Sequence, residues 1–207
     1  MSATAITYDS GMVRWEPNAR GRLEQAAFEL YVERGFEQTT VAEIAQRAGL
    51  TERTFFRHFA DKREVLFAGA AGLEEFFVTA LAGAPETATP IDAVAVALDA
   101  VGALMQEHSG SVRQRAAIIA ANAELQEREL IKLASLSSAL AEALRRRGVT
   151  DPAASLTAEA GVAVFRIAFG RWISDADQRD LQYFMRESLA ELKAVTAAGA
   201  AAPAAPR

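Results

Sequence analysis

Residues 38–63, QTTVAEIAQRAGLTERTFFRHFADKR, contain the pattern that decides the fold of this chain. Thr40 precedes an apolar run and is followed by Glu43 at the spacing of a capping box. In a capping box, the hydroxyl and the carboxylate satisfy free backbone amides at the start of a helix, and the cap contributes about 1 kcal/mol. The pattern therefore predicts a short helix over residues 41–47.

A second start signal follows within the same stretch. Gly49 breaks the first helix, because glycine readily adopts the positive φ that a tight turn needs. Thr51 is a suitable N-cap for another short helix, which carries Phe55. Two short helices joined by a tight turn have the layout of a helix-turn-helix. The spacing alone also fits an ordinary helical hairpin, so it leaves both interpretations open.

The rest of the chain shows helical periodicity, and no segment alternates as a strand would. Leu23, Leu30 and Tyr31 share one face of a first helix that ends at Gly35. Further helices are predicted from Asp61 to about Gly83, from Pro90 to about residue 108, over 111–121 and 124–147, after Pro152, and from Asp175 onward. The sequence therefore predicts an all-α protein with about nine helices.

Composition and charge narrow the function classes. The 207 residues include no cysteine, which excludes a disulfide framework and a thiolate zinc site. No apolar run approaches the length of a membrane span and no secretory signal is present, so we expect a cytoplasmic protein without a membrane partner. The chain has 22 basic and 27 acidic residues, a net charge of −5, which by itself argues against a polyanionic partner. Basic and acidic residues balance up to Arg63, however, so the acidic excess belongs to the remainder of the chain.

The particular amino-acid sequence of residues 23–67 favours DNA binding over an ordinary helical hairpin. The segments AAFELYVERGF, TTVAEIAQRAGL, TERTFFRHF and DKREVLF closely resemble the DNA-binding domain of the TetR family of bacterial repressors. The resemblance implies a three-helix DNA-binding domain, a larger helical domain for an inducer, and a homodimer that leaves its operator when the inducer binds. We expect an arm over residues 1–13, a helix-turn-helix domain over 14–63, a ligand-binding and dimerisation domain over 64–196, and a disordered tail over 197–207.

The second short helix is expected to lie in the major groove, where its first residues reach base edges. The residues predicted to read bases are Thr51, Glu52, Arg53 and Thr54, with Phe56 in contact with a thymine methyl. Phe56 stands where the family often has tyrosine, so it cannot donate to a phosphate. The residues predicted to hold phosphates are Thr39, Thr40, Arg57, His58 and Lys62. Thr40 and Thr51 also serve as helix caps, and in the family residues such as Arg14, Arg20 and Arg22 often extend to the DNA backbone or minor groove.

The sequence after residue 63 indicates its function less specifically than the helix-turn-helix segment does. Residues 127–152 and 156–173 resemble a C-terminal domain of TetR-family regulators that are thought to sense acyl-CoA-like ligands, which implies a small apolar or acyl-type inducer. The candidates for a pocket are Phe76, Phe77, Met105, His108, Ile119, Asn122, Phe165, Phe169 and Trp172. Aromatic residues and methionine at helical spacing are more often plain core, so Asn122 and His108 are the better pointers. The helix over 157–173 and the last helix are expected to form a four-helix bundle between two protomers, unless both are buried within one chain.

Two other functions stay open. A small helical enzyme would need placed acids, bases or nucleophiles, and the chain offers only His58 and His108 besides its carboxylates and hydroxyls. We therefore predict no catalytic residue, no metal site and no cofactor. A dimeric adaptor with a degenerate DNA-binding domain is the other alternative, because the helix-turn-helix is only modestly basic.

Overall fold

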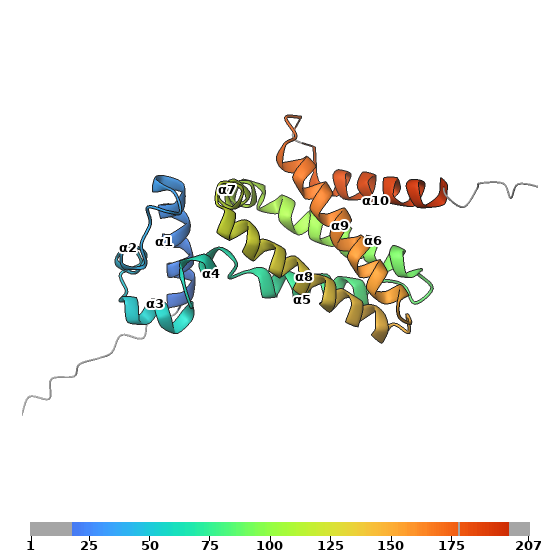
Figure 1. The fold of residues 1–207 in the computed structure, drawn as a ribbon, viewed down its shortest axis with the longest axis horizontal. Helices are drawn as coiled ribbons and strands as arrows, with labels where there is room; N and C mark the ends of the chain where they lie inside the picture. Colours follow the sequence, from blue (N-terminus) through green and yellow to red (C-terminus); the bar gives the residue numbers. More distant parts are fainter. Residues whose placement is uncertain (1–17, 178, 199–207) are drawn as a thin grey trace, which may run out of the picture.

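The computed structural model describes residues 18–177 and 179–198, and within these ranges every regular element is an α-helix (Figure 1). The helices are α1 (Ala19–Arg34), α2 (Val41–Arg47), α3 (Glu52–His58), α4 (Lys62–Leu66), α5 (Ala70–Ala82), α6 (Pro90–Glu107), α7 (Ser109–Ala120), α8 (Ala123–Arg146), α9 (Ala153–Ile173) and α10 (Leu181–Ala198). The all-α prediction is therefore confirmed. Helices α1–α3 lie at one end of the molecule, α5–α10 form a larger bundle, and α4 lies between them (Figure 1).

The small domain is built around α1, which packs against α2, α3 and α4. Leu23 and Leu30 of α1, Ile44 of α2 and Phe55 of α3 are buried together. Between α2 and α3, Gly49 adopts a φ of 65°, and a Cβ there would lie 2.8 Å from Nη2 of Arg22. The positive φ favours glycine in this turn, and a Cβ there would also force the Arg22 guanidinium to shift.

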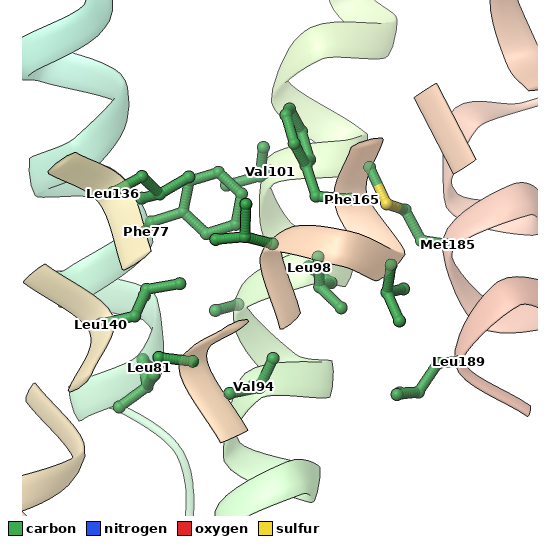
Figure 2. Close-up of a cluster of buried hydrophobic side chains, with 14 of the residues drawn as sticks. Phe77, Leu81, Val94, Leu98, Val101, Leu136, Leu140, Phe165, Met185 and Leu189 are labelled. Atoms are coloured by element: carbon green, nitrogen blue, oxygen red, sulfur yellow. The ribbon is translucent and has the colours of Figure 1, made fainter. Parts of the chain in front are cut away.

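The large domain has a continuous apolar core to which five helices contribute (Figure 2). The labelled side chains come from α5 (Phe77, Leu81), α6 (Val94, Leu98, Val101), α8 (Leu136, Leu140), α9 (Phe165) and α10 (Met185, Leu189). Helix α9 packs against α6, α8 and α10, and its Trp172 is completely buried. This central position accounts for the apolar and small residues that run through α9.

The two cores meet at α4 and α7. Val65 and Leu66 of α4, with Phe67 after it, belong to the core of the small domain, as do Ile119 of α7 and Leu125 of α8. The predicted boundary after residue 63 therefore falls inside a packed unit.

Several predicted boundaries differ from the structure. The long helix predicted from Asp61 to Gly83 is interrupted at residues 67–69, because Phe67 turns into the core of the small domain. The stop expected over residues 108–110 is reduced to His108, since α7 begins at Ser109. The last helix begins at Leu181 rather than at Asp175, whose carboxylate instead accepts from the backbone amide of Arg179 at 2.9 Å. Helix α10 extends to Ala198, past the predicted start of the tail; the predicted arm and the rest of the tail lie outside the described residues.

Two segments, Lys62–Ala82 and Ala153–Ile173, are long and apolar enough to cross a membrane by length and composition alone. The first is divided by the turn at residues 67–69, and the second is the central helix of the bundle. Packing in the two cores accounts for the apolar character of both segments.

The close approach of α9 to α6 can be tested by substitution at the glycine where the two helices cross. A Cβ at Gly161 would lie 2.7 Å from Cγ1 of Val94, which is buried, whereas a Cβ at Gly72 in α5 would meet open space. We expect Gly72→Ala to raise the free energy of unfolding by about 0.5–1 kcal/mol, because alanine is the better helix former. Relative to that control, Gly161→Ala should lower it by about 1–3 kcal/mol through overpacking. Urea denaturation measures both, and equal effects would contradict so close an approach of α9 to α6.

Candidate functional site

Helix α3 has one buried face and one exposed face. Phe55 is fully buried, and Phe59, just after the helix, is buried beside it with ring centroids 5.5 Å apart. On the opposite face, Glu52, Arg53 and Arg57 are exposed. Phe56 is 55% exposed although it is large and apolar. The core thus fixes the orientation of α3 and leaves a mixed basic and aromatic face open.

The arginines of α3 differ from the neighbouring arginines in their lack of ion-pair partners within the part of the chain that the structure describes. Arg53 and Arg57 make no ion pair or hydrogen bond with another residue in the described ranges. By contrast, Arg47 of α2 pairs with Glu33 at 2.8 Å, and Arg34 of α1 pairs with Glu43 at 3.0 Å. Among the described residues of this domain, the cations of α3 are therefore available to an anionic partner, although the domain as a whole is neutral.

The predicted helix caps are present. Thr40 Oγ1 accepts from the Glu43 amide at 3.2 Å and Glu43 Oε2 accepts from the Thr40 amide at 2.9 Å, which completes the capping box. Hydrogen bonds from the backbone and hydroxyl of Thr40 lower the pKa of Glu43. Thr51 Oγ1 accepts from the Thr54 amide at 3.2 Å, and the two hydroxyls are 3.0 Å apart. Both caps leave Thr40 and Thr51 exposed, so the structure is compatible with the second role predicted for them.

Two of the predicted phosphate ligands face the protein instead. Thr39 is only 1% exposed, and its hydroxyl donates to the Gly35 carbonyl at 2.9 Å. His58 is half-buried, and its Nε2 is covered and has no hydrogen-bond partner within the described ranges. Neither Thr39 Oγ1 nor His58 Nε2 can reach a phosphate in this conformation. Their positions depend on tertiary packing, which the polar pattern of the sequence does not reveal.

Lys62, at the start of α4, is also engaged within the protein. Its Nζ donates to the carbonyls of Phe36 at 2.9 Å, Glu37 at 3.3 Å and Thr39 at 3.0 Å. The ammonium also lies 4.3 Å from the centre of the Phe36 ring. An ammonium group has three donors, so these carbonyls occupy all of them. In this structure Lys62 closes the turn between α1 and α2, directly before Thr40.

The described arginines at the start of α1 also donate to backbone carbonyls, although the Arg20 side chain stays 51% exposed. Arg20 Nη2 donates to the Ala68 carbonyl at 3.2 Å, and Arg22 donates to the carbonyl of Ala48. Arg14 lies outside the described residues. The described arginines therefore hold α1 to the turn that follows α2 and to the segment after α4.

A cavity of about 460 Å³ opens in the large domain beside the junction with α4. Three of the predicted pocket residues line it: Met105, Phe165 and Phe169. Its apolar wall continues through residues such as Leu73 and Leu136, and this size and character suit a small-molecule site. The cavity also has charged lining residues that the sequence analysis missed, namely Glu74, Arg115, Glu129, Lys132 and Arg166.

Arg115 could have been recognised from its spacing. It lies between Val112 and Ile119 on the apolar side of α7, where a charge is unusual. The other charged residues follow no such signal, because their alignment around one cavity depends on how α5, α8 and α9 pack.

The remaining pocket candidates lie elsewhere. Phe77 and Trp172 are core residues, and Phe77 packs edge-on against Phe165 with ring centroids 5.4 Å apart. Ile119 belongs to the core of the small domain. Asn122 donates to the Ile118 carbonyl at 2.7 Å and lines a separate groove between α1 and α7. Phe76 and His108 are exposed, and His108 Nδ1 lies 3.2 Å from the Leu104 carbonyl oxygen. None of these six side chains lines the cavity, so their predicted place in it is wrong.

A capped helix-turn-helix with an open basic face, joined to a helical bundle with a cavity, defines a DNA-binding protein with a separate sensor domain. Residues 24–68 match the family model described as bacterial regulatory proteins, tetR family. Residues 88–197, more than half of the chain, match the model described as the MftR C-terminal domain. The chain belongs to the TetR family of bacterial transcription regulators.

Individual relatives agree with this assignment. The HTH-type transcriptional regulator TcmR of Streptomyces glaucescens is 40% identical over 82 residues, which are 40% of this chain and 36% of that protein. The match thus spans only about a third of the length of TcmR. A solved structure of Thermus thermophilus FadR, a TetR family transcriptional repressor in complex with lauroyl-CoA, is similar at 25% identity and a TM-score of 0.53, covering 91% of this chain and 98% of that chain. SmeT, the repressor of the Stenotrophomonas maltophilia multidrug efflux pump SmeDEF, has the same fold at 21% identity and a TM-score of 0.60, covering 85% of this chain and 89% of its own.

The contacts of Lys62 lead to a prediction about its role on DNA. If its ammonium stays on the three carbonyls, Lys62→Met should weaken DNA binding without changing how steeply affinity falls with salt, because no phosphate contact is lost. Arg57→Met should instead reduce the slope of log Kobs against log salt by about 0.9, the value for one phosphate. Fluorescence anisotropy over a salt series measures both slopes. An equal reduction in the two variants would show that Lys62 leaves its carbonyls to bind a phosphate, as the sequence predicts.

Proposed function

We propose that the chain is a ligand-responsive repressor that binds a palindromic operator as a homodimer and is released from it by a small apolar or acyl-type inducer. The observation that carries the proposal is the exposed face of α3, where Arg53 and Arg57 are unpaired within the described ranges and Phe56 is open. Leaving two cations and a large aromatic ring on one small face suits a surface that reads DNA. The proposed base contacts come from Thr51, Glu52, Arg53, Thr54 and Phe56.

The outer surface of α9 and α10 supports dimer formation. Leu156 and Ile167 of α9 and Tyr183 of α10 are exposed although they are large and apolar, and the two helices pack side by side. Large apolar side chains left exposed on two packed helices are candidates for an association site. A second copy would cover them in a four-helix bundle, and the two-fold axis would place the two α3 helices about 34 Å apart, one turn of DNA.

The cavity supports the proposal that a small-molecule inducer binds to the large domain. Its apolar wall and mixed charged residues suit an amphipathic molecule, and FadR of Thermus thermophilus has been solved with lauroyl-CoA. A regulator of this kind acts on the chromosome, so we place it in the cytoplasm. The adaptor alternative would keep the dimer and lose DNA binding, which the following two experiments separate.

DNA binding can be tested with the region upstream of the protein's own gene. We expect Arg53→Ala to cost about 1–3 kcal/mol on the specific site and to reduce the difference between that site and a scrambled duplex. Arg146→Ala, which removes an exposed cation at the far end of α8, should change neither affinity. Anisotropy titrations at one salt concentration measure these values. If the wild type binds none of the upstream duplexes at low salt, the repressor proposal fails.

The dimer can be tested at Ile167, which is 54% exposed on α9. Ile167→Asp should convert the dimer to a monomer and weaken operator binding, because a charge would be buried without a partner at the interface. Leu130→Asp is the matched control, since Leu130 is 58% exposed on α8. Light scattering after size-exclusion chromatography gives the masses. A dimer that survives Ile167→Asp but not Leu130→Asp would place the interface on α8 instead.

A further inference from the structure

We propose that the cavity binds a long-chain acid whose free carboxylate is received by Arg115, rather than a thioester whose charge lies far from the acyl chain. The inference deepens the proposed function, and it rests on that function only for the release of DNA. Arg115 lies on α7 and lines the cavity. Its guanidinium is held by the carbonyl of Leu66, with Nε at 2.8 Å, and lies 4.9 Å from the centre of the Phe67 ring.

Arg115 has one anionic partner in the described ranges, Glu129, and the contact between them is long. Its side chain is 29% exposed, and its nearest carboxylate is that of Glu129 at 3.5 Å, longer than a well-formed charged hydrogen bond. Removal from water lowers the pKa of Arg115, which Glu129 only partly opposes. A carboxylate placed in the cavity would supply the short, two-pronged contact that a guanidinium favours.

The charged residues that line the cavity carry a net positive charge of one. Arg115, Lys132 and Arg166 contribute three cations, against the carboxylates of Glu74 and Glu129. Lys132 has its nearest carboxylate, Glu64, at 3.9 Å, and Glu64 is already paired with Arg128. Arg166 makes no ion pair within residues 18–177 and 179–198. One carboxylate would therefore neutralise the excess charge of the cavity.

The apolar side of the cavity indicates what the carboxylate is attached to. Phe165 and Phe169 are stacked with centroids 5.9 Å apart, and Met105 and Leu136 also line the wall. The Phe165 side of this wall continues into the bundle core (Figure 2). A hydrocarbon chain would bury its surface there, and each buried methylene would add to the affinity. The apolar wall and the cationic Arg115 border the same cavity. The carboxylate and the hydrocarbon chain therefore belong to one molecule with a small head group.

The position of Arg115 also links the head group to the DNA-binding domain. The carbonyl that Arg115 holds belongs to Leu66, the last residue of α4. A carboxylate that engages Nε and one Nη of Arg115 together would compete with this carbonyl for Nε. Binding of the acid would therefore loosen the end of the helix that joins the two domains.

The test is calorimetry on the full-length protein without DNA, using dodecanoate, dodecanol, dodecyltrimethylammonium and lauroyl-CoA, each below its micelle concentration. Dodecanoate should bind roughly tenfold or more tightly than dodecanol, the value of one charged hydrogen bond. Arg115→Gln should abolish this preference and Arg115→Lys should retain part of it. Arg113→Gln is the matched control and should keep the preference, because Arg113 lies on the same helix, holds the Ile173 carbonyl at 3.1 Å and stacks on Trp172.

A second measurement needs no variant, in case Arg115→Gln does not fold. The pKa of carboxyl-labelled dodecanoate bound to the wild type, followed by carbon NMR, should lie below that of the free acid, since a guanidinium stabilises the carboxylate. An equal or raised pKa would overturn the inference, as would dodecanol binding equally well, or lauroyl-CoA binding more tightly and independently of Arg115. If dodecanoate fails to bind while the protein still binds its operator, this inference falls and the repressor proposal stands.

Discussion

The rest of the structure depends on how the five-residue helix α4 is held at its two ends. At its start, the ammonium of Lys62 takes three carbonyls of the α1–α2 turn, and the Lys62 carbonyl accepts from the hydroxyl of Tyr31 at 2.6 Å. At its end, Arg115 of the large domain takes the carbonyl of Leu66. In between, Glu64 pairs with Arg128 of α8. So short a helix has little stability of its own, and these contacts fix its position between the domains.

The positive charge that the small domain presents to a partner depends on which of its arginines form ion pairs, and not on its net charge. Arginines on α1 and α2 are neutralised by carboxylates such as Glu33 and Glu43, or are bound to backbone carbonyls. Arg53 and Arg57 of α3 have no such partner within the described ranges. A neutral domain can therefore present a local positive face, and the acidic remainder of the chain lies on other helices. The field at a surface depends on where the free charges lie.

Local features could be predicted from the sequence, and those that depend on tertiary contacts could not. The caps at Thr40 and Thr51 are confirmed because each is formed by residues at fixed short spacing. The break at Phe67 was missed because it depends on a core that includes Ile119, which is distant in the sequence. The cavity was predicted in part, since Met105, Phe165 and Phe169 were identified by type. Its cations were not, because Lys132 and Arg166 face one space only after α8 and α9 pack.

The presence of Ile119 and Leu125 in the core of the small domain limits how far the protein is modular. A fragment ending after α4 would lack two buried side chains and would expose Leu66 and Phe67 to water. Residues of the large domain thus complete the core of the DNA-binding domain. No single division of the sequence separates the two domains without exposing part of that core. A chimera that exchanges sensors between regulators of this kind would have to carry the α7–α8 corner along with its own helix-turn-helix.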